Sequence, residues 1–256
     1  MQMTNAITVK TSSEMKIMKE GGKKLGQIKK KLIQGTKEGV SAAEIEKLAC
    51  SLIKKQGGTP SFKMVPGYSW ATCININEGI VHGIPKKTIV FKKGDVVSVD
   101  LGMFYKGFHT DTAFSKCISP SKDIEKFLKV GEKALKAAID QATPGNRIYD
   151  ISKAIEDVLK KNNLQPVEAL VGHGIGRDLH EQPQIPCFTK AKRDKTLIIP
   201  EGATFAIEVM YTMGLPEIQV EEDGWTIRLK DDKISGLFEE TVAISSNGPI
   251  VLTKVN

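Results

Sequence analysis

Acidic side chains placed in apolar segments are the residues of this sequence best suited to chemistry. Asp100 and Glu208 each end an apolar run, and a lone carboxylate there would most simply form a salt bridge or cap a helix. Here the acids form a set, because Asp111 follows Asp100 across a predicted hairpin and Glu239-Glu240 lies within another apolar strand. Carboxylates packed together repel one another strongly. Divalent cations are their natural counter-charge, since hard oxygen ligands can bridge two metals.

The four histidines of the chain add candidate ligands and proton donors. His173 lies between two glycines, where the backbone can approach closely and an imidazole can point into a cleft. His82 precedes a glycine in a similar turn, and His180 precedes a Glu-Gln-Pro segment. A lone histidine is more often a satisfied polar residue than a ligand. We expect that role for His109, which lies two residues before Asp111 and is the closest competitor as a ligand.

An internal repeat predicts how these side chains come together. Segment 94–100 consists of a glycine turn, an apolar strand and an acid, and segment 202–208 has the same form. Two helical segments are related by about the same offset. We therefore expect a single pseudo-symmetric α+β catalytic domain. Its predicted limits are 1–256, with halves of about 11–120 and 121–250 and a short N-terminal segment 1–10.

Local patterns predict the elements that carry these residues. Thr11 and Glu14 form a predicted capping box, and periodic apolar residues after it predict a helix. Gly21, Gly22 and Gly26 are expected to loosen that helix. The remainder after residue 161 is expected to be mainly short strands. The other predicted elements are helices over 41–55, 124–142 and 148–161, strands over 73–77, 88–91, 95–101 and 110–118, and a turn over 105–107.

The composition is that of an ordinary globular protein, with 256 residues of which 40% are hydrophobic. The net charge of +7 comes largely from lysine clusters, which we expect to be solvated surfaces with at most weak attraction to RNA or a ribosome. The sequence contains no apolar run of about 18 residues or more, so it predicts no membrane-spanning helix. Four scattered cysteines favour reduced thiols. We expect a monomeric, cytoplasmic protein without membrane contact.

Taken in order, these motifs resemble those of type I methionine aminopeptidases. The match runs from about Thr11 to about Asn247, and the ordered set is specific although no single string is. The strings are His82-Gly-Ile-Pro85, Val99-Asp100, His109-Thr-Asp-Thr112, Gly172-His-Gly-Ile-Gly-Arg177, His180-Glu-Gln-Pro183, Ile207-Glu208 and Phe238-Glu239.

The resemblance implies the pita-bread fold, a pseudo-two-fold arrangement of helices and strands. It implies removal of the initiator methionine from nascent polypeptides, with a hydroxide that bridges two divalent metal ions as the nucleophile. These ligands accept Co, Mn, Fe or Zn, so the sequence does not choose among them. Asp111 and Glu239 are the implied bridging ligands. The implied ligand set is Asp100, Asp111, His173, Glu208 and Glu239.

The choice of Glu239 over Glu240 rests on the family pattern, in which the ligand directly follows an aromatic residue. Strand alternation leaves both open, because both faces of 237–244 are apolar. The resemblance also implies that Glu208 shuttles a proton as well as binding metal. His180 would stabilise the tetrahedral oxyanion, and His82 would hold the amide being cut. The α-amine of the substrate would bind the second metal.

Tyr68, Cys73 and Trp225 match the positions that line the methionine side-chain pocket in the family. The sequence departs from the family beside them. Segment 65–69 stands where bacterial members often carry a Tyr-His-Gly-Tyr-Pro-like segment, and Leu179 stands where an aromatic residue often precedes the second histidine. The pocket is expected to stay apolar, and the flexible thioether of methionine tolerates such repacking.

Two alternatives remain open at this point. Another pita-bread exopeptidase, such as a prolidase or aminopeptidase P, would share the ligand set but usually carries an additional N-terminal domain. A non-catalytic relative could use the fold as a binding module for RNA or protein, which the basic charge permits. The complete ligand set argues against the second alternative.

Overall fold

The structure, a computed structural model, describes residues 7–254, so residues 1–6 of the predicted N-terminal segment lie outside the described residues. Its helices are α1 (Ser12–Gly35), α2 (Ala42–Lys55), α3 (Lys122–Gln141) and α4 (Ile148–Lys161). Its long strands are β4 (Val96–Tyr105), β5 (Phe108–Cys117), β9 (Thr204–Thr212) and β12 (Ser235–Ser245). The shorter elements are β1 (Thr59–Pro60), η1 (Phe62–Met64), β2 (Thr72–Ile76), β3 (Gly79–Val81), β6 (Gln165–Pro166), β7 (Val171–Gly174), β8 (Glu181–Pro186), η2 (Arg193–Lys195), β10 (Ile218–Val220), β11 (Ile227–Leu229) and β13 (Gly248–Val251).

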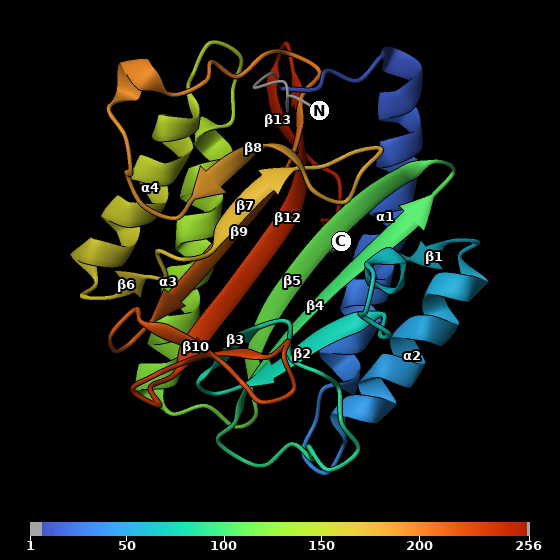
Figure 1. Ribbon diagram of the computed structural model, residues 1–256, viewed down its shortest axis with the longest axis vertical. Helices are drawn as coiled ribbons and strands as arrows, with labels where there is room; N and C mark the ends of the chain where they lie inside the picture. The colour runs from blue at the N-terminus through green and yellow to red at the C-terminus, as the bar shows by residue number, and fades with distance from the viewer. Residues whose placement is uncertain (1–6, 255–256) are drawn as a thin grey trace.

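One antiparallel sheet spans the molecule in the order β1-β4-β5-β12-β9-β7-β8 (Figure 1). Strand β2 pairs with β4, β6 with β9 and β13 with β12, while β10, β11 and β3 form a small second sheet. The helix pair α1 and α2 lies behind the β4–β5 half, and α3 and α4 lie behind the β9–β12 half (Figure 1). The order of two helices and then two long strands recurs in the two halves. The duplication of 11–120 as 121–250 stays a prediction.

Each half of the sheet has its own hydrophobic core against its helix pair. One core joins α1 and α2 to β4 and β5 through residues such as Leu25 and Val99. The other joins α3 and α4 to β9 and β12 through residues such as Ile151 and Phe205. Burial on the helix-covered face explains why the long strands carry so many apolar residues. None of the helices within 7–254 is long and apolar enough to cross a membrane.

Helix α1 begins as predicted and then departs from the prediction. The Thr11 hydroxyl accepts a hydrogen bond from the Glu14 amide, and the Glu14 carboxylate accepts one from the Thr11 amide at 2.7 Å, which confirms the capping box. The expected loosening by glycines is wrong, because the helix is unbroken. A Cβ on Gly22 would lie 2.7 Å from the Leu252 side chain. A Cβ on Gly26 would lie 2.7 Å from the backbone oxygens of Thr253 and Lys254. These glycines let α1 lie directly against the C-terminal segment.

The predicted turn between β4 and β5 is confirmed. Lys106 and Gly107 both have positive φ, at 48° and 90°, as a tight two-residue hairpin turn requires. The other expectations were less accurate. In the segment predicted as a strand over 88–91, only Val90 makes an isolated bridge, to Ser41. The segment after residue 161 consists mainly of short strands, as expected, but it also contains the long strands β9 and β12.

The acids do not end their strands. Asp100 lies in the middle of β4 and Glu208 in the middle of β9, because both strands continue past the acid as buried segments. A mid-strand carboxylate on the buried face of a sheet has less access to water than one at a strand end. The expected solvated lysine surface is also wrong at one position, since Lys29 is buried.

Gly22→Ala tests the packing role of the glycines in α1. Although alanine favours a helix interior by roughly 1 kcal/mol over glycine, we expect this change to lower the free energy of unfolding by about 1–3 kcal/mol, as overpacking does. Gly35→Ala is the matched control, because its Cβ would meet only the ends of two flexible side chains, Leu48 at 3.3 Å and Ile45 at 3.5 Å. Urea denaturation measures both. Equal effects of the two changes would contradict the packing explanation.

Candidate metal centre

A row of acids crosses the middle of the sheet. Asp100 pairs with Ala113 across β4 and β5, and Ala113 pairs with Glu239 across β5 and β12. Glu239 pairs in turn with Glu208 of β9. Asp111 lies two residues before Ala113 on β5, so side-chain alternation puts it on the same face. Four carboxylates therefore share one face of four neighbouring strands.

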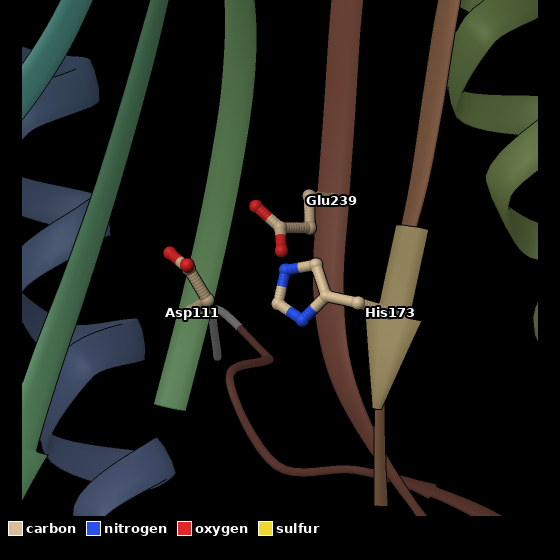
Figure 2. Close-up of side chains that lie close together, drawn as sticks. All are labelled: Asp111, His173 and Glu239. Carbon is tan, nitrogen blue, oxygen red and sulfur yellow. The ribbon is translucent and has the colours of Figure 1, made fainter. Parts of the chain in front are cut away.

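His173 joins this group from β7. It pairs with Ala206, two residues before Glu208, and therefore faces the same side of the sheet. Asp111, His173 and Glu239 each offer a ligand atom, and these atoms all lie within 4.8 Å of one another. Figure 2 shows the three side chains gathered from β5, β7 and β12. The Nε2 atom of His173 lies 3.6 Å from a Glu208 oxygen.

Hydrogen bonding orients the His173 ring toward the acids. Its Nδ1 donates to the backbone oxygen of Gly174 at 2.8 Å, so Nε2 is the nitrogen that faces Glu208. Burial, together with a smaller effect of the nearby His180, lowers the pKa of His173 to about 3. The ring is therefore neutral at physiological pH, with a free lone pair on Nε2. This is the protonation state in which imidazole binds a metal.

Burial dominates the electrostatics of the four carboxyl groups. It raises the pKa of Asp111 to about 7. It also raises the pKa values of Asp100, Glu208 and Glu239 well above their ordinary range, and the neighbouring carboxylates raise them further. Without a counter-charge, these groups hold protons that a cation would displace.

Two carboxylate oxygens of the acidic row are buried and have no hydrogen-bond partner among the described residues. They are Oδ1 of Asp100 and Oε1 of Glu239, at opposite sides of Asp111 in the strand order. Buried polar atoms normally have hydrogen-bond partners, so each of these two unpaired oxygens needs an explanation. Carboxylate oxygens together with a neutral imidazole are donors that suit divalent cations. The residues present therefore fit a divalent metal site.

The adjacent acids Glu239 and Glu240 face opposite sides of β12. Glu239 faces the acidic row, whereas Glu240 points toward α1 and forms a 2.6 Å ion pair with Lys29. Glu240 also accepts a hydrogen bond from the Thr253 hydroxyl, and one of its oxygens lies 3.3 Å from the Thr112 hydroxyl. Of the two candidates left open by strand alternation, only Glu239 can reach the cluster.

The two predicted helper histidines lie beside the acids. His82 adopts a left-handed backbone conformation with φ of 58°, and the next residue, Gly83, would place a Cβ only 2.3 Å from the Ile74 oxygen. His82 lines the same cavity as the four acids. The rings of His180 and His173 meet edge to face with centroids 4.5 Å apart. Partial desolvation by the surrounding cavity lowers the pKa values of both His82 and His180, although both residues stay partly exposed, so both rings are neutral near pH 7.

An apolar pocket continues from the acids in a cavity of about 260 Å³. Tyr68 stands at its centre, with ring centroids 5.1 Å from Trp225, and its hydroxyl donates to the Thr72 oxygen at 2.9 Å. Phe62 meets Tyr68 edge to face and adds aromatic surface that the sequence reasoning missed. The apolar lining is Phe62, Val65, Tyr68, Cys73, Val81, Leu179 and Trp225. Departures from the family at Val65 and Leu179 thus leave an apolar pocket.

Two further contacts were not apparent from the sequence. Lys10 forms a buried 2.5 Å ion pair with Glu181, whose other oxygen accepts from the Arg177 amide. The pair holds the N-terminal segment against the loop that carries His180. His109 lies outside the cluster, where its Nδ1 is 2.9 Å from the Ser61 hydroxyl. No local sequence pattern predicts either contact, because the partners are far apart in sequence.

The metal-free protein is expected to lose stability as pH rises from about 5 to about 7. Asp111 has a pKa of about 7 in the folded chain against an ordinary value of 3.8, so the folded chain binds more protons between these values. The free energy of unfolding then falls with rising pH, by roughly 1 kcal/mol per pH unit for each such proton. Urea denaturation of chelator-treated protein measures this. A stability that rises across this range would contradict the buried acidic row.

Comparison with known proteins places this chain in a family. The family model of metallopeptidase family M24 matches residues 16–244. Methionine aminopeptidase 1 of Bacillus subtilis (strain 168) is 37% identical over 250 residues, which cover 97% of this chain and 100% of the relative. The methionine aminopeptidase of Clostridium perfringens (strain 13 / Type A) is 36% identical over 250 residues, covering 97% and 99%.

Solved structures agree with the arrangement of the sheet and helices. The crystal structure of methionine aminopeptidase from Thermotoga maritima has a TM-score of 0.94 and 36% identity, covering 97% of this chain and 100% of that chain. The prolidase from Pyrococcus horikoshii OT3 has a TM-score of 0.77 at 21% identity and shows the shared fold alone; this chain covers 64% of it. The predicted pita-bread fold is confirmed. The chain belongs to metallopeptidase family M24, among the methionine aminopeptidases.

Proposed function

We propose that this protein is a metal-dependent hydrolase that removes the N-terminal methionine from peptides and nascent polypeptides. The observation that carries the proposal is the buried row of acids with His173, in which two carboxylate oxygens have no hydrogen-bond partner among the described residues. Full-length similarity to proteins named methionine aminopeptidase supports the substrate, and membership of a metallopeptidase family supports the use of a divalent metal.

We propose that the site holds two divalent cations. Strand order supports this number, because Asp111 and Glu239 come from the two central strands and can serve both sides as bridging ligands. Asp100 lies on one side of them, and Glu208 and His173 lie on the other. When bound, such cations lower the pKa of a shared water toward neutrality and so supply the nucleophile. The donor set accepts Mn, Fe, Co or Zn alike.

Protein groups around the cations would handle the protons and the developing charge. Glu208 is buried and its pKa is raised, so its carboxylate is a good proton acceptor from the attacking water and a donor to the leaving amine. Neutral His180 keeps one N–H that can stabilise the tetrahedral oxyanion. Neutral His82, which lines the same cavity, can hold the amide being cut. Both histidines line the cavity together with the acids.

The shape of the cavity favours cleavage at the first residue. The methionine side chain would enter the apolar pocket around Tyr68 and Trp225, where aromatic rings and Cys73 suit a thioether. The rest of the peptide would leave through a wider cleft of about 550 Å³ beside His82 and His180. The free α-amine would bind at the acidic row, and an internal peptide bond has no such amine to offer.

The cellular setting stays a prediction. We propose a monomer in the cytoplasm that makes at most weak contact with the ribosome. The four free cysteines support a reducing compartment. The exposed basic residues of 190–195 support weak attraction to RNA.

Peptide cleavage tests the proposed specificity. The metal-loaded protein is expected to release free methionine from Met-Ala-Ser and to leave Ala-Pro and other X-Pro peptides intact, because its pocket is built for a long apolar first residue. Amino-acid analysis of the products measures this. Cleavage of X-Pro peptides with Met-Ala-Ser ignored would show that the protein is a prolidase-like exopeptidase instead.

Two substitutions test the assigned roles. His180→Ala is expected to lower kcat by about 10²–10³-fold, the usual loss when an oxyanion donor is removed. Asp111→Ala is expected to abolish turnover and to weaken metal binding. Asp140→Ala is the control for Asp111→Ala, because Asp140 is an exposed acid on α3 paired with Lys136. Wild-type rates in both site variants would rule out the mechanism.

A further inference from the structure

The two halves of the sheet meet at a seam, which is the stretch where β5 and β12 face each other. Backbone pairing at the seam is short, since only Thr112 with Glu240 and Ala113 with Glu239 are in register there. The neighbouring β4–β5 and β9–β12 ladders run along almost the whole length of their strands. Because Asp111 and Glu239 lie on opposite sides of the seam, its width sets the separation of their carboxylates.

Side-chain hydroxyls replace much of the missing backbone pairing. The Ser115 hydroxyl donates to the Leu237 oxygen at 2.9 Å and accepts from the Leu237 amide at 2.8 Å. The Thr241 hydroxyl bonds in the same way to the backbone of Asp111, at 2.7 and 2.8 Å. Each hydroxyl thus spans from one strand to the backbone of the other.

A third hydroxyl crosses the seam at the level of the acidic row. Thr112 donates from its hydroxyl to the backbone oxygen of Glu239 at 2.8 Å. Its amide donates to the Asp111 carboxylate at 2.9 Å. Thr112 is fully buried, so water does not compete for these bonds. This one residue therefore contacts both central acids of the row.

Lys29 of α1 fixes the direction of this hydroxyl from behind the sheet. Its ammonium donates to the Thr112 hydroxyl at 2.8 Å and to Glu240 at 2.6 Å. An ammonium can only donate, so the Thr112 hydroxyl accepts from Lys29. Its single proton goes to the nearer of its two acceptors, which is the backbone oxygen of Glu239 at 2.8 Å rather than the Glu240 carboxylate at 3.3 Å. The side chain of Lys29 is only 5% exposed and that of Glu240 17% exposed. The ion pair between Lys29 and Glu240 thus lies at the seam, on the face of the sheet opposite the acids.

We propose that Lys29, Thr112 and Glu240 form a positioning clasp that sets the separation of the Asp111 and Glu239 carboxylates and thereby the affinity of the site for divalent cations. The inference rests on the proposed metal-dependent function. The three residues act through the ligands and are not placed against substrate. Partners behind metal ligands commonly change metal affinity or activity by about 10–100-fold when they are replaced.

Thr112→Val and Thr112→Ser test the clasp by Mn²⁺ titration calorimetry of metal-free protein. Valine keeps the shape and removes the hydroxyl, so we expect Mn²⁺ affinity to fall by about 10–100-fold. Serine keeps the hydroxyl and is expected to restore near wild-type affinity. Ser115→Ala is the matched control, since it removes a seam hydroxyl that bonds to Leu237 rather than to a ligand. It is expected to lower stability and leave Mn²⁺ affinity unchanged.

A charge-neutral pair, Lys29→Met with Glu240→Gln, gives an independent test if Thr112→Val does not fold. We expect it to weaken Mn²⁺ binding by a similar factor, with little added effect when combined with Thr112→Val, because the residues act as one unit. Circular dichroism at the titration temperature confirms that each variant is folded. Wild-type Mn²⁺ affinity in both Thr112→Val and the charge-neutral pair would overturn the clasp while leaving the proposed function intact. A wild-type protein that binds no Mn²⁺ would overturn both.

Discussion

Carboxylates that lie side by side on a buried face must either hold protons or share cations, and this constraint governs the structure. Asp100, Glu239 and Glu208 form a cross-strand row, with Asp111 beside them on the same face. Burial raises the pKa of all four, and neighbouring carboxylates raise the pKa values of Asp100, Glu208 and Glu239 further. A cation replaces the protons and relieves the repulsion at once. Metal affinity, pH and stability are therefore linked in this protein through one set of groups.

The adjacent acids Glu239 and Glu240 face opposite sides of β12 and have different countercharges. Glu239 faces the row, where its countercharge would be a cation, and Glu240 faces α1, where its countercharge is Lys29. The period of two along a strand makes this separation possible. Glycines in α1 complete the arrangement, because a close approach to the C-terminal segment brings Lys29 within reach of the seam. The chemistry on one face thus depends on packing on the other.

Local patterns in the sequence were enough to predict the local features of the fold. The capping box at Thr11, the hairpin turn at Lys106 and the helix Ile148–Lys161 each depend on a few neighbouring residues, and the structure has all three. Spacing and resemblance also named the acids and histidines that the sheet brings together. The prediction that glycines loosen α1 was wrong, and the roles of Lys29 at the seam and Phe62 in the pocket were not predicted. All of these roles depend on partners far along the chain.

Anomalous X-ray diffraction from crystals of the Mn²⁺-loaded protein tests the central claim most directly. The expected result is two adjacent anomalous peaks on the buried face of the sheet, both in contact with the carboxylates of Asp111 and Glu239. One peak should also contact Asp100, and the other should contact His173 and Glu208. Peaks elsewhere, or acids paired only with protein cations and no manganese between them, would contradict the account.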